Sequence, residues 1–214
     1  MTQPTATPDQ HTLADVMGWL DERPARGERC LLGITGAPGA GKSTVAEQLA
    51  AGLEPDPPVV GMDGYHLAHA HLAELGLVAR KGAHYTFDAW GFVSLVRRIA
   101  EQGPDEVIYA PRFDRSIEDS IAASIPITFD DRVIIIEGTY LLVDLAPWNE
   151  LRGLMTRCIY LDLDEEVRLQ RLIDRHVEFG KTPDHARRHV AESDQVNARL
   201  IEDFRHRADF FVHM

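Results

Sequence analysis

Residues 36–44 constrain the fold of this chain more than any other segment. They read Gly-Ala-Pro-Gly-Ala-Gly-Lys-Ser-Thr and fit the pattern G-x-x-x-x-G-K-[ST], in which glycines let successive backbone N–H groups curl around an anion. A helix that begins directly after such a loop adds its partially positive N-terminus to the same site. The pattern therefore predicts that a nucleotide phosphate is held by Gly36, Ala37, Pro38, Gly39, Ala40, Gly41, Lys42, Ser43 and Thr44.

The segments on both sides of the loop have the composition that this site needs. Residues 30–35 form a short apolar run of the length of a buried parallel strand. After the loop, Val45, Leu49 and Leu53 recur at helical spacing. A strand, a phosphate-binding loop and a helix therefore follow one another. Lys42 is expected to reach the β- and γ-phosphates, and the Ser43 hydroxyl is expected to ligate Mg²⁺.

Composition narrows the class of protein. The chain has 214 residues, 44% hydrophobic and 26% charged, as expected for one α/β domain over residues 1–214, with residues 1–12 as a frayed end. No apolar run reaches the ~18 residues of a membrane helix, and the first residues lack the regions of a signal peptide, so we expect a cytoplasmic protein without a membrane partner. The formal net charge of −12 disfavours nucleic acid as a partner.

Two carboxylates end apolar runs that are typical of parallel strands. Asp63 follows residues 59–62, and Glu137 follows the β-branched residues 133–136. Ligands gather at the carboxyl ends of strands in open parallel sheets, so both side chains are expected on the edge that holds Lys42. Glu137 is then expected near the Mg²⁺ ion that Ser43 ligates. The alternatives are an Asp-Gly turn and an ordinary buried strand with an acidic end.

A row of arginines lies in the helix expected from about residue 165. Arg168, Arg171 and Arg175 fall at i, i+3 and i+7 and share one helix face. Arg171 and Arg175 repel each other at i and i+4 unless an anion lies nearby. We predict a lid over about residues 165–195, from which Arg171 and Arg175 act as catalytic cations on the transferring phosphoryl group. A solvated, salt-bridged helix face is the alternative.

With these residues in place, the chain resembles the phosphate-loop small-molecule kinases that include uridine kinase, phosphoribulokinase and bacterial type I pantothenate kinase. The similar segments are residues 62–67, 86–88, 136–138 and 168–181. The chain is closer still to a branch described as nucleoside/nucleotide kinase-like or as fructose transport system kinases, through residues 80–83, 109–115, 179–183 and 193–200. The resemblance extends over about residues 31–212.

The resemblance implies the P-loop NTPase fold, in which helices flank a central, mostly parallel five-stranded sheet and a helical arginine-bearing lid covers the site. It also implies that Asp63 is the catalytic base toward the acceptor hydroxyl, whereas the residues alone leave Glu137 open as the base. The residues expected to contact the acceptor are Asp63, Tyr65, His66, Asp88, Tyr109, Arg112 and Arg115. ATP and Mg²⁺ are the expected cofactors.

The predicted function is ATP-dependent phosphorylation of a hydroxyl group on a small polar metabolite, such as a sugar or a pantothenate-like or nucleoside-like acceptor. A homodimer is compatible with this prediction. The alternative is a nucleotide-hydrolysing switch or regulator without a small-molecule acceptor. A GTPase is disfavoured, because the guanine-reading pattern Asn-Lys-x-Asp is absent and the only asparagines are Asn149 and Asn197.

Overall fold

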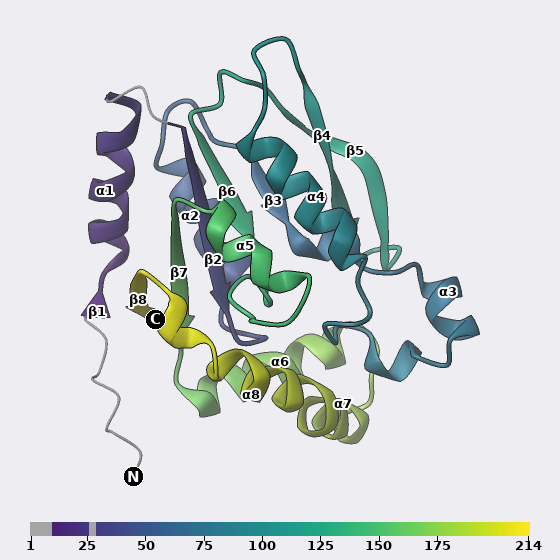
Figure 1. Cartoon of the computed structure of the whole chain (residues 1–214). Coiled ribbons are helices and arrows are strands. Elements are labelled where there is room, and N and C mark those ends of the chain that lie inside the picture. Colours follow the sequence, from purple (N-terminus) through teal and green to yellow (C-terminus); the bar gives the residue numbers. More distant parts are fainter. Residues whose placement is uncertain (1–9, 26–28) are drawn as a thin grey trace.

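Six strands in the described part of the chain form one parallel sheet. The computed structural model describes residues 10–25 and 29–214, and the strand order is β1 (Gln10–His11), β8 (Phe210–His213), β7 (Arg157–Asp162), β2 (Cys30–Gly36), β6 (Val133–Glu137) and β3 (Val59–Gly61) (Figure 1). Every neighbouring pair is parallel. The carboxyl ends of the strands therefore lie along one edge of the sheet.

The predicted parallel sheet is confirmed, with one strand more than expected. Gln10 and His11 are not frayed, because they pair with Phe211 and Val212 at the edge of the sheet. The His11 ring also lies 4.9 Å from the Phe210 ring, in an edge-to-face contact. Backbone pairing and this ring contact hold a segment whose polar composition predicts no structure. The rest of the predicted frayed end, residues 1–9, lies outside the described residues.

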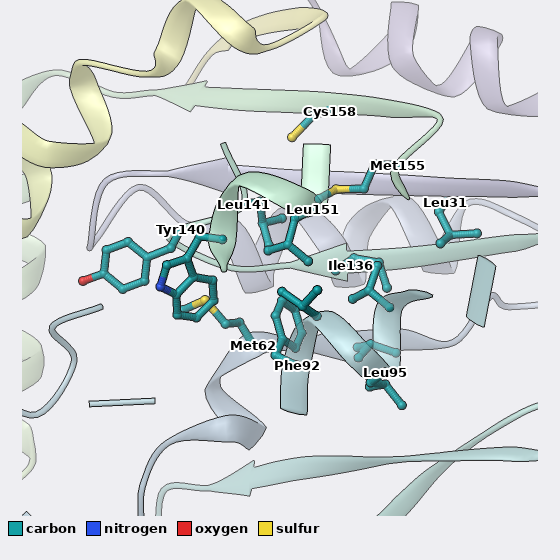
Figure 2. Close-up of a cluster of buried hydrophobic side chains, with 14 of the residues drawn as sticks. Leu31, Met62, Phe92, Leu95, Ile136, Tyr140, Leu141, Leu151, Met155 and Cys158 are labelled. Carbon is teal, nitrogen blue, oxygen red and sulfur yellow. The ribbon is translucent and has the colours of Figure 1, made fainter. Parts of the chain in front are cut away.

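Strand alternation divides the core between the two faces of the sheet. Ile134 and Ile136 belong to one buried cluster, and Val133 and Ile135 belong to the other. Helices α1 (Leu13–Ala25) and α2 (Lys42–Ala51) cover the face of Ile135, and α4 (Ala89–Ala100) and α5 (Leu151–Leu154) cover the face of Ile136. Figure 2 shows the second face, where Phe92 of α4 points toward Ile136. The central strands are therefore buried on both sides, as their apolar runs predict.

A two-stranded antiparallel hairpin stands apart from the main sheet. It consists of β4 (Ile108–Asp114) and β5 (Asp119–Ile127), with an irregular register between Ala110 and Arg112. The sequence predicts a charged turn over residues 111–115, and this is wrong for residues 111–114, which extend β4. The local sequence of residues 111–114 carries no signal for a strand. These residues are extended because they pair with β5, which follows them in the chain and has a mixed composition.

Helices after β7 gather at one end of the sheet (Figure 1). They are α6 (Glu165–Glu178), α7 (Pro183–His189), a π-helical segment (Val190–Asp194) and α8 (Gln195–Glu202). Asp164 caps α6 by accepting from the N–H groups of Glu166 and Val167, and Thr182 caps α7. The predicted helical lid over about residues 165–195 therefore exists as helices.

Short elements complete the described chain. They are α3 (His69–Glu74) and 3₁₀ turns at Met62–Tyr65, Val78–Arg80, Trp148–Glu150 and Arg205–Arg207. The helices of residues 10–25 and 29–214 include none that combines the length and the apolar character needed to cross a bilayer.

Truncation of Ile135 tests the assignment of this core. Ile135 of β6 is fully buried against the α1–α2 layer, so Ile135→Ala removes apolar contacts that its neighbours cannot replace. We expect the free energy of unfolding to fall by about 2–5 kcal/mol in a urea titration. Val107→Ala, at a side chain that is 45% exposed, serves as the control and should change it by less than about 0.5 kcal/mol. Equal losses in the two variants would contradict the assignment of the core.

Candidate functional site

The phosphate loop connects β2 to α2 with two glycines in the left-handed region. Gly39 has φ 84° and Gly41 has φ 90°, values that side chains rarely adopt. A Cβ atom at Gly39 would lie 2.8 Å from Cγ of Leu172 in α6, so the loop also touches the lid closely. Gly41 precedes α2 and offers no side chain to cap it, which leaves the first N–H groups of α2 available to an anion.

Lys42 folds back onto the loop. Its Nζ donates to the backbone oxygens of Gly36 (3.0 Å) and Ala37 (3.2 Å). Removal from water lowers the pKa of the Lys42 ammonium, and the Glu137 carboxylate opposes this shift. The ammonium group therefore donates to two uncharged carbonyl oxygens. A phosphate would replace them as a stronger acceptor, because it carries negative charge.

Glu137 and Ser43 form a pair of oxygen groups below the loop. The Ser43 hydroxyl donates to Oε1 of Glu137 over 3.3 Å. Burial raises the pKa of the Glu137 carboxyl to about 7; the Asp63 carboxylate adds to the shift and Lys42 opposes it. A Cβ atom at Gly61 would lie 3.0 Å from this oxygen, so the end of β3 leaves room for the carboxylate. Hydroxyl and carboxylate oxygens at this position are the donors that Mg²⁺ prefers.

Asp63 lies in the turn that follows β3. Its Oδ2 accepts from Nη2 of Arg115 over 3.3 Å. The Asp63 backbone oxygen accepts from Nδ1 of His66 at 2.9 Å, and burial lowers the pKa of that imidazole. The His66 ring lies 4.0 Å from the Phe87 ring and 5.1 Å from the Phe113 ring. A neutral imidazole between two aromatic rings therefore forms a wall beside the carboxylate.

The three arginines of α6 do not have the same surroundings. Arg168 is buried, and its Nη1 donates to the Pro38 backbone oxygen of the phosphate loop over 3.1 Å. Its other terminal nitrogen donates to Gln195 in α8. Arg171 and Arg175 instead line the cavity above the loop. Arg168 is thus committed to holding the lid on the loop, which leaves the other two arginines for a ligand.

One cavity of about 920 Å³ brings most of the predicted site residues together. The predicted residues that line it are Pro38, Gly39, Gly41, Lys42, Ser43, Thr44, Asp63, His66, Arg115, Glu137, Arg171 and Arg175. Gly36, Ala37 and Ala40 of the loop do not line the cavity, and the backbone oxygens of Gly36 and Ala37 accept from Lys42.

Four residues predicted to contact the acceptor do not line this cavity. The Asp88 carboxylate accepts from the Gly91 N–H (2.8 Å) as the cap of α4, beside a separate and smaller cavity. The Tyr65 ring packs edge-to-face on Phe92, 5.4 Å away. Tyr109 is exposed on β4, where alternation buries Ile108 and Ala110 instead, and Arg112 is exposed after the irregular register that follows Ala110. Capping, core packing and exposure on β4 direct these side chains away from this cavity, and their contact with the acceptor stays a prediction.

Several cavity residues carry too weak a sequence signal to be predicted as a site. They are Lys81, Phe113, Glu118, His176, Lys181 and His189. They come from a 3₁₀ turn, the hairpin and the lid, which are far apart in the chain. The basic turn over residues 80–82 and the charge-rich hairpin are the only local indications of this wall.

The phosphate loop shares its cavity with Glu137, from the end of the neighbouring strand β6, and with Arg171 and Arg175 of the helical lid. This combination defines a P-loop phosphotransferase. Comparison with known proteins places the chain within that class. It belongs to the Phosphoribulokinase / Uridine kinase family, whose profile matches residues 31–212.

Individual relatives agree with this assignment. The chain is 37% identical to the ATP-dependent kinase-like protein notR' of Aspergillus versicolor over 145 residues, which cover 64% of this chain and 84% of that protein. It is 29% identical to a uridine kinase of Clostridium novyi over 185 residues, or 85% of this chain and 86% of that protein. A solved structure from Silicibacter sp. TM1040, provisionally described as a fructose transport system kinase, superposes with a TM-score of 0.83 at 37% identity, over 94% of this chain and 98% of that one.

The chain is therefore an ATP-dependent kinase whose acceptor is a hydroxyl group of a small molecule. This confirms the predicted function, and no finding supports the alternative of a nucleotide-dependent switch. The predicted P-loop kinase fold is confirmed as well.

Glu137 makes stability depend on pH in a definite direction. Its pKa rises from 4.5 to about 7 on folding, so the folded chain binds this proton more tightly than the unfolded chain does. The resulting stabilisation is complete below pH 4.5 and is lost as pH rises through about 7. Glu137→Gln should remove this loss and, at pH 8 in metal-free buffer, raise the free energy of unfolding by about 1–3 kcal/mol.

Urea titrations of wild type and variant between pH 4 and pH 8 measure this difference. Glu47→Gln, on the exposed side of α2, is the matched control and should follow the wild-type curve at every pH. A Glu137→Gln variant whose stability keeps the wild-type dependence on pH would show that the carboxyl titrates normally.

Proposed function

We propose that the cavity is the active site, in which Mg·ATP occupies the loop side and the acceptor lies against Asp63. The observation that carries this proposal is the position of the Asp63 carboxylate. It shares one cavity with Lys42 on the loop and with Arg175 on the lid, and it follows directly from the end of β3. Phosphoryl transfer needs mainly positioning and charge neutralisation, and the cavity supplies groups for both.

The donor side fits a triphosphate with Mg²⁺. Lys42 has no direct contact with a carboxylate among the described residues and donates instead to two backbone carbonyls. Ser43 and Glu137 would hold the metal with their oxygens, and a buried carboxyl with a raised pKa gains stability from a nearby cation. Bound Mg²⁺ offsets negative charge on the β- and γ-phosphates.

The acceptor side provides a base and a wall. In the proposed step, the acceptor oxygen forms a bond to the γ-phosphorus while the bond from that phosphorus to the β–γ bridging oxygen breaks, and ADP leaves. The hydroxyl proton passes to the Asp63 carboxylate. Arg115 now occupies Oδ2 of Asp63 and would have to release it when the hydroxyl arrives. The rings of His66 and Phe113 would face the acceptor's carbon skeleton.

Arg171 and Arg175 are proposed to stabilise the charge on the transferring group. Burial lowers the pKa of the Arg175 guanidinium, which stays charged because the ordinary pKa of arginine is so high. A half-buried, charged arginine without a carboxylate within 4 Å among the described residues favours an incoming anion. Arg171 lies nearer the loop, with Nη1 3.8 Å from the place that a Cβ atom at Gly41 would take.

The setting that we propose is a single kinase domain in the cytoplasm. Strands from both ends of the described chain, β1 and β8, pair in the same sheet, which supports one domain. Cys30 and Cys158 are buried thiols, as a reducing compartment allows. The net charge of −12 supports a partner that is neither nucleic acid nor an acidic membrane. A homodimer stays a prediction.

Asp63→Asn tests the proposed base. A screen of sugars, nucleosides, pantothenate and other small alcohols with Mg·ATP, read as acceptor-dependent ADP formation, first identifies a working acceptor. We expect Asp63→Asn to lower kcat by roughly 10²-fold or more. ATP binding should stay near the wild-type value, because the loop and Lys42 are untouched.

The matched control is Asp184→Asn, at a carboxylate that is 90% exposed at the start of α7. This variant should keep wild-type kinetics. An unchanged kcat in Asp63→Asn with the same acceptor would remove Asp63 from the role of base and favour Glu137.

A further inference from the structure

The cavity as a whole contains more cationic side chains than carboxylates. Its cations are Lys42, Lys81, Arg115, Arg171, Arg175 and Lys181, and its carboxylates are Asp63, Glu118, Glu137 and Asp194. This local excess of cations stands against a formal net charge of −12 for the whole chain. A concentration of positive charge in one cavity of an acidic protein indicates an anionic ligand.

The carboxylates on the acceptor side of the cavity are already in contact with other groups. Nζ of Lys81 lies 3.3 Å from Oε2 of Glu118. Asp194 accepts from Nε2 of His176 at 2.8 Å, so its charge is directed toward an imidazole. Asp63, the partner of Arg115, has to meet the acceptor hydroxyl in the proposed reaction. When Asp63 meets the hydroxyl, Glu118 and Asp194 are therefore not available to replace it as the partner of Arg115.

Lys181 has no carboxylate within 4 Å among the described residues. Its Nζ lies 3.1 Å from the ring nitrogen Nδ1 of His176. Burial lowers the pKa of Lys181, and the more distant Asp194 and Glu118 carboxylates oppose this shift. Burial and the Lys181 charge also lower the pKa of His189 to about 4. The lid therefore presents to the cavity a cation that no carboxylate of the described residues contacts directly.

Three of the cavity's cations, Lys81, Arg115 and Lys181, lie outside the group that we assign to the nucleotide. Lys42, Arg171 and Arg175 suffice to surround a triphosphate that also carries Mg²⁺. Arg115 belongs to the hairpin side, where its guanidinium lies 5.9 Å from the Phe113 ring centre, and the Lys81 ammonium lies 5.0 Å from the same ring. Arg115 from the hairpin and Lys181 from the lid line the same cavity as Asp63.

We infer that the acceptor is an anionic alcohol, in which a carboxylate or phosphate monoester group binds Arg115 and Lys181 while a hydroxyl group meets Asp63. Lys81 and the Phe113 ring flank the carbon skeleton. Binding of the anionic group also draws Arg115 away from Asp63 and so frees the base only when the correct acceptor is present. This inference rests on the proposed function and specifies the substrate class of the same site.

The first experiment needs no knowledge of the acceptor. The protein is saturated with Mg²⁺ and the non-hydrolysable ATP analogue AMP-PNP, which fills the loop, and inorganic phosphate is titrated by calorimetry against a chloride blank of equal ionic strength. We expect one further phosphate to bind. Lys181→Gln and Arg115→Gln should each weaken this binding by at least about 5-fold, as loss of a charge-assisted hydrogen bond predicts.

The control is Arg187→Gln, which removes an equal charge from the exposed side of α7, where Arg187 pairs with Asp184 outside the cavity. It should bind phosphate as wild type does. Absence of a further phosphate, or equal affinity in wild type and Lys181→Gln, overturns the inference.

The second experiment compares acceptors that differ only in the anionic group. The pairs are glycerate with glycerol, pantothenate with panthenol, and sugar phosphates with the free sugars, each with Mg·ATP and read as ADP formation. We expect the anionic member of the working pair to have a kcat/KM higher by about 100-fold or more. Lys181→Gln should raise its KM by about 10-fold and leave the KM for ATP within about 2-fold.

The outcomes separate the inference from the proposed function. A neutral alcohol that is phosphorylated better than its anionic partner overturns the inference and leaves the kinase assignment intact. If no alcohol of either class raises ADP formation above the rate without acceptor, the proposed reaction fails, and the phosphate titration then decides by itself whether the anion site exists.

Discussion

The parallel register of β2, β6 and β3 is the constraint on which the site depends. Pairing aligns Ile34 of β2 with Glu137 of β6, and Glu137 with Gly61 of β3. Because the three strands end together, the phosphate loop, the buried carboxyl and the turn that carries Asp63 lie along one edge of the sheet. A register shift of one residue would turn Glu137 toward the opposite face and separate it from Ser43.

Burial of opposite charges gives this edge its chemistry. Glu137 and Lys42 are both removed from water, and each shifts the other's pKa toward the charged form while burial shifts it toward the neutral form. Burial of these charges therefore costs folding free energy in the absence of ligands, and a bound phosphate and cation reduce that cost. Low stability of the empty site and affinity for a charged nucleotide have the same physical origin.

Local patterns in the sequence predict those parts of the site that are local in the chain. The glycines and lysine of residues 36–44, the acidic ends of the strands at Asp63 and Glu137, and the helical spacing of Arg171 and Arg175 each stand within one element. The wall opposite the loop joins the hairpin, a 3₁₀ turn and the lid, so it exists only after folding. The exposure of Tyr109 likewise follows from the pairing of β4 with β5, which the local sequence does not indicate.

The hydrogen bond from Arg168 to Pro38 limits how the lid can move. A buried guanidinium near the first turn of α6 is tied to the backbone of the phosphate loop, and Leu172 lies against Gly39 one turn later. The base of the lid therefore follows the loop, and any opening has to pivot about that contact. Distance from a fixed pivot increases displacement, so Lys181, beyond the far end of α6, would travel farther than Arg171. A nucleotide that orders the loop would thereby set the position of groups that it never touches.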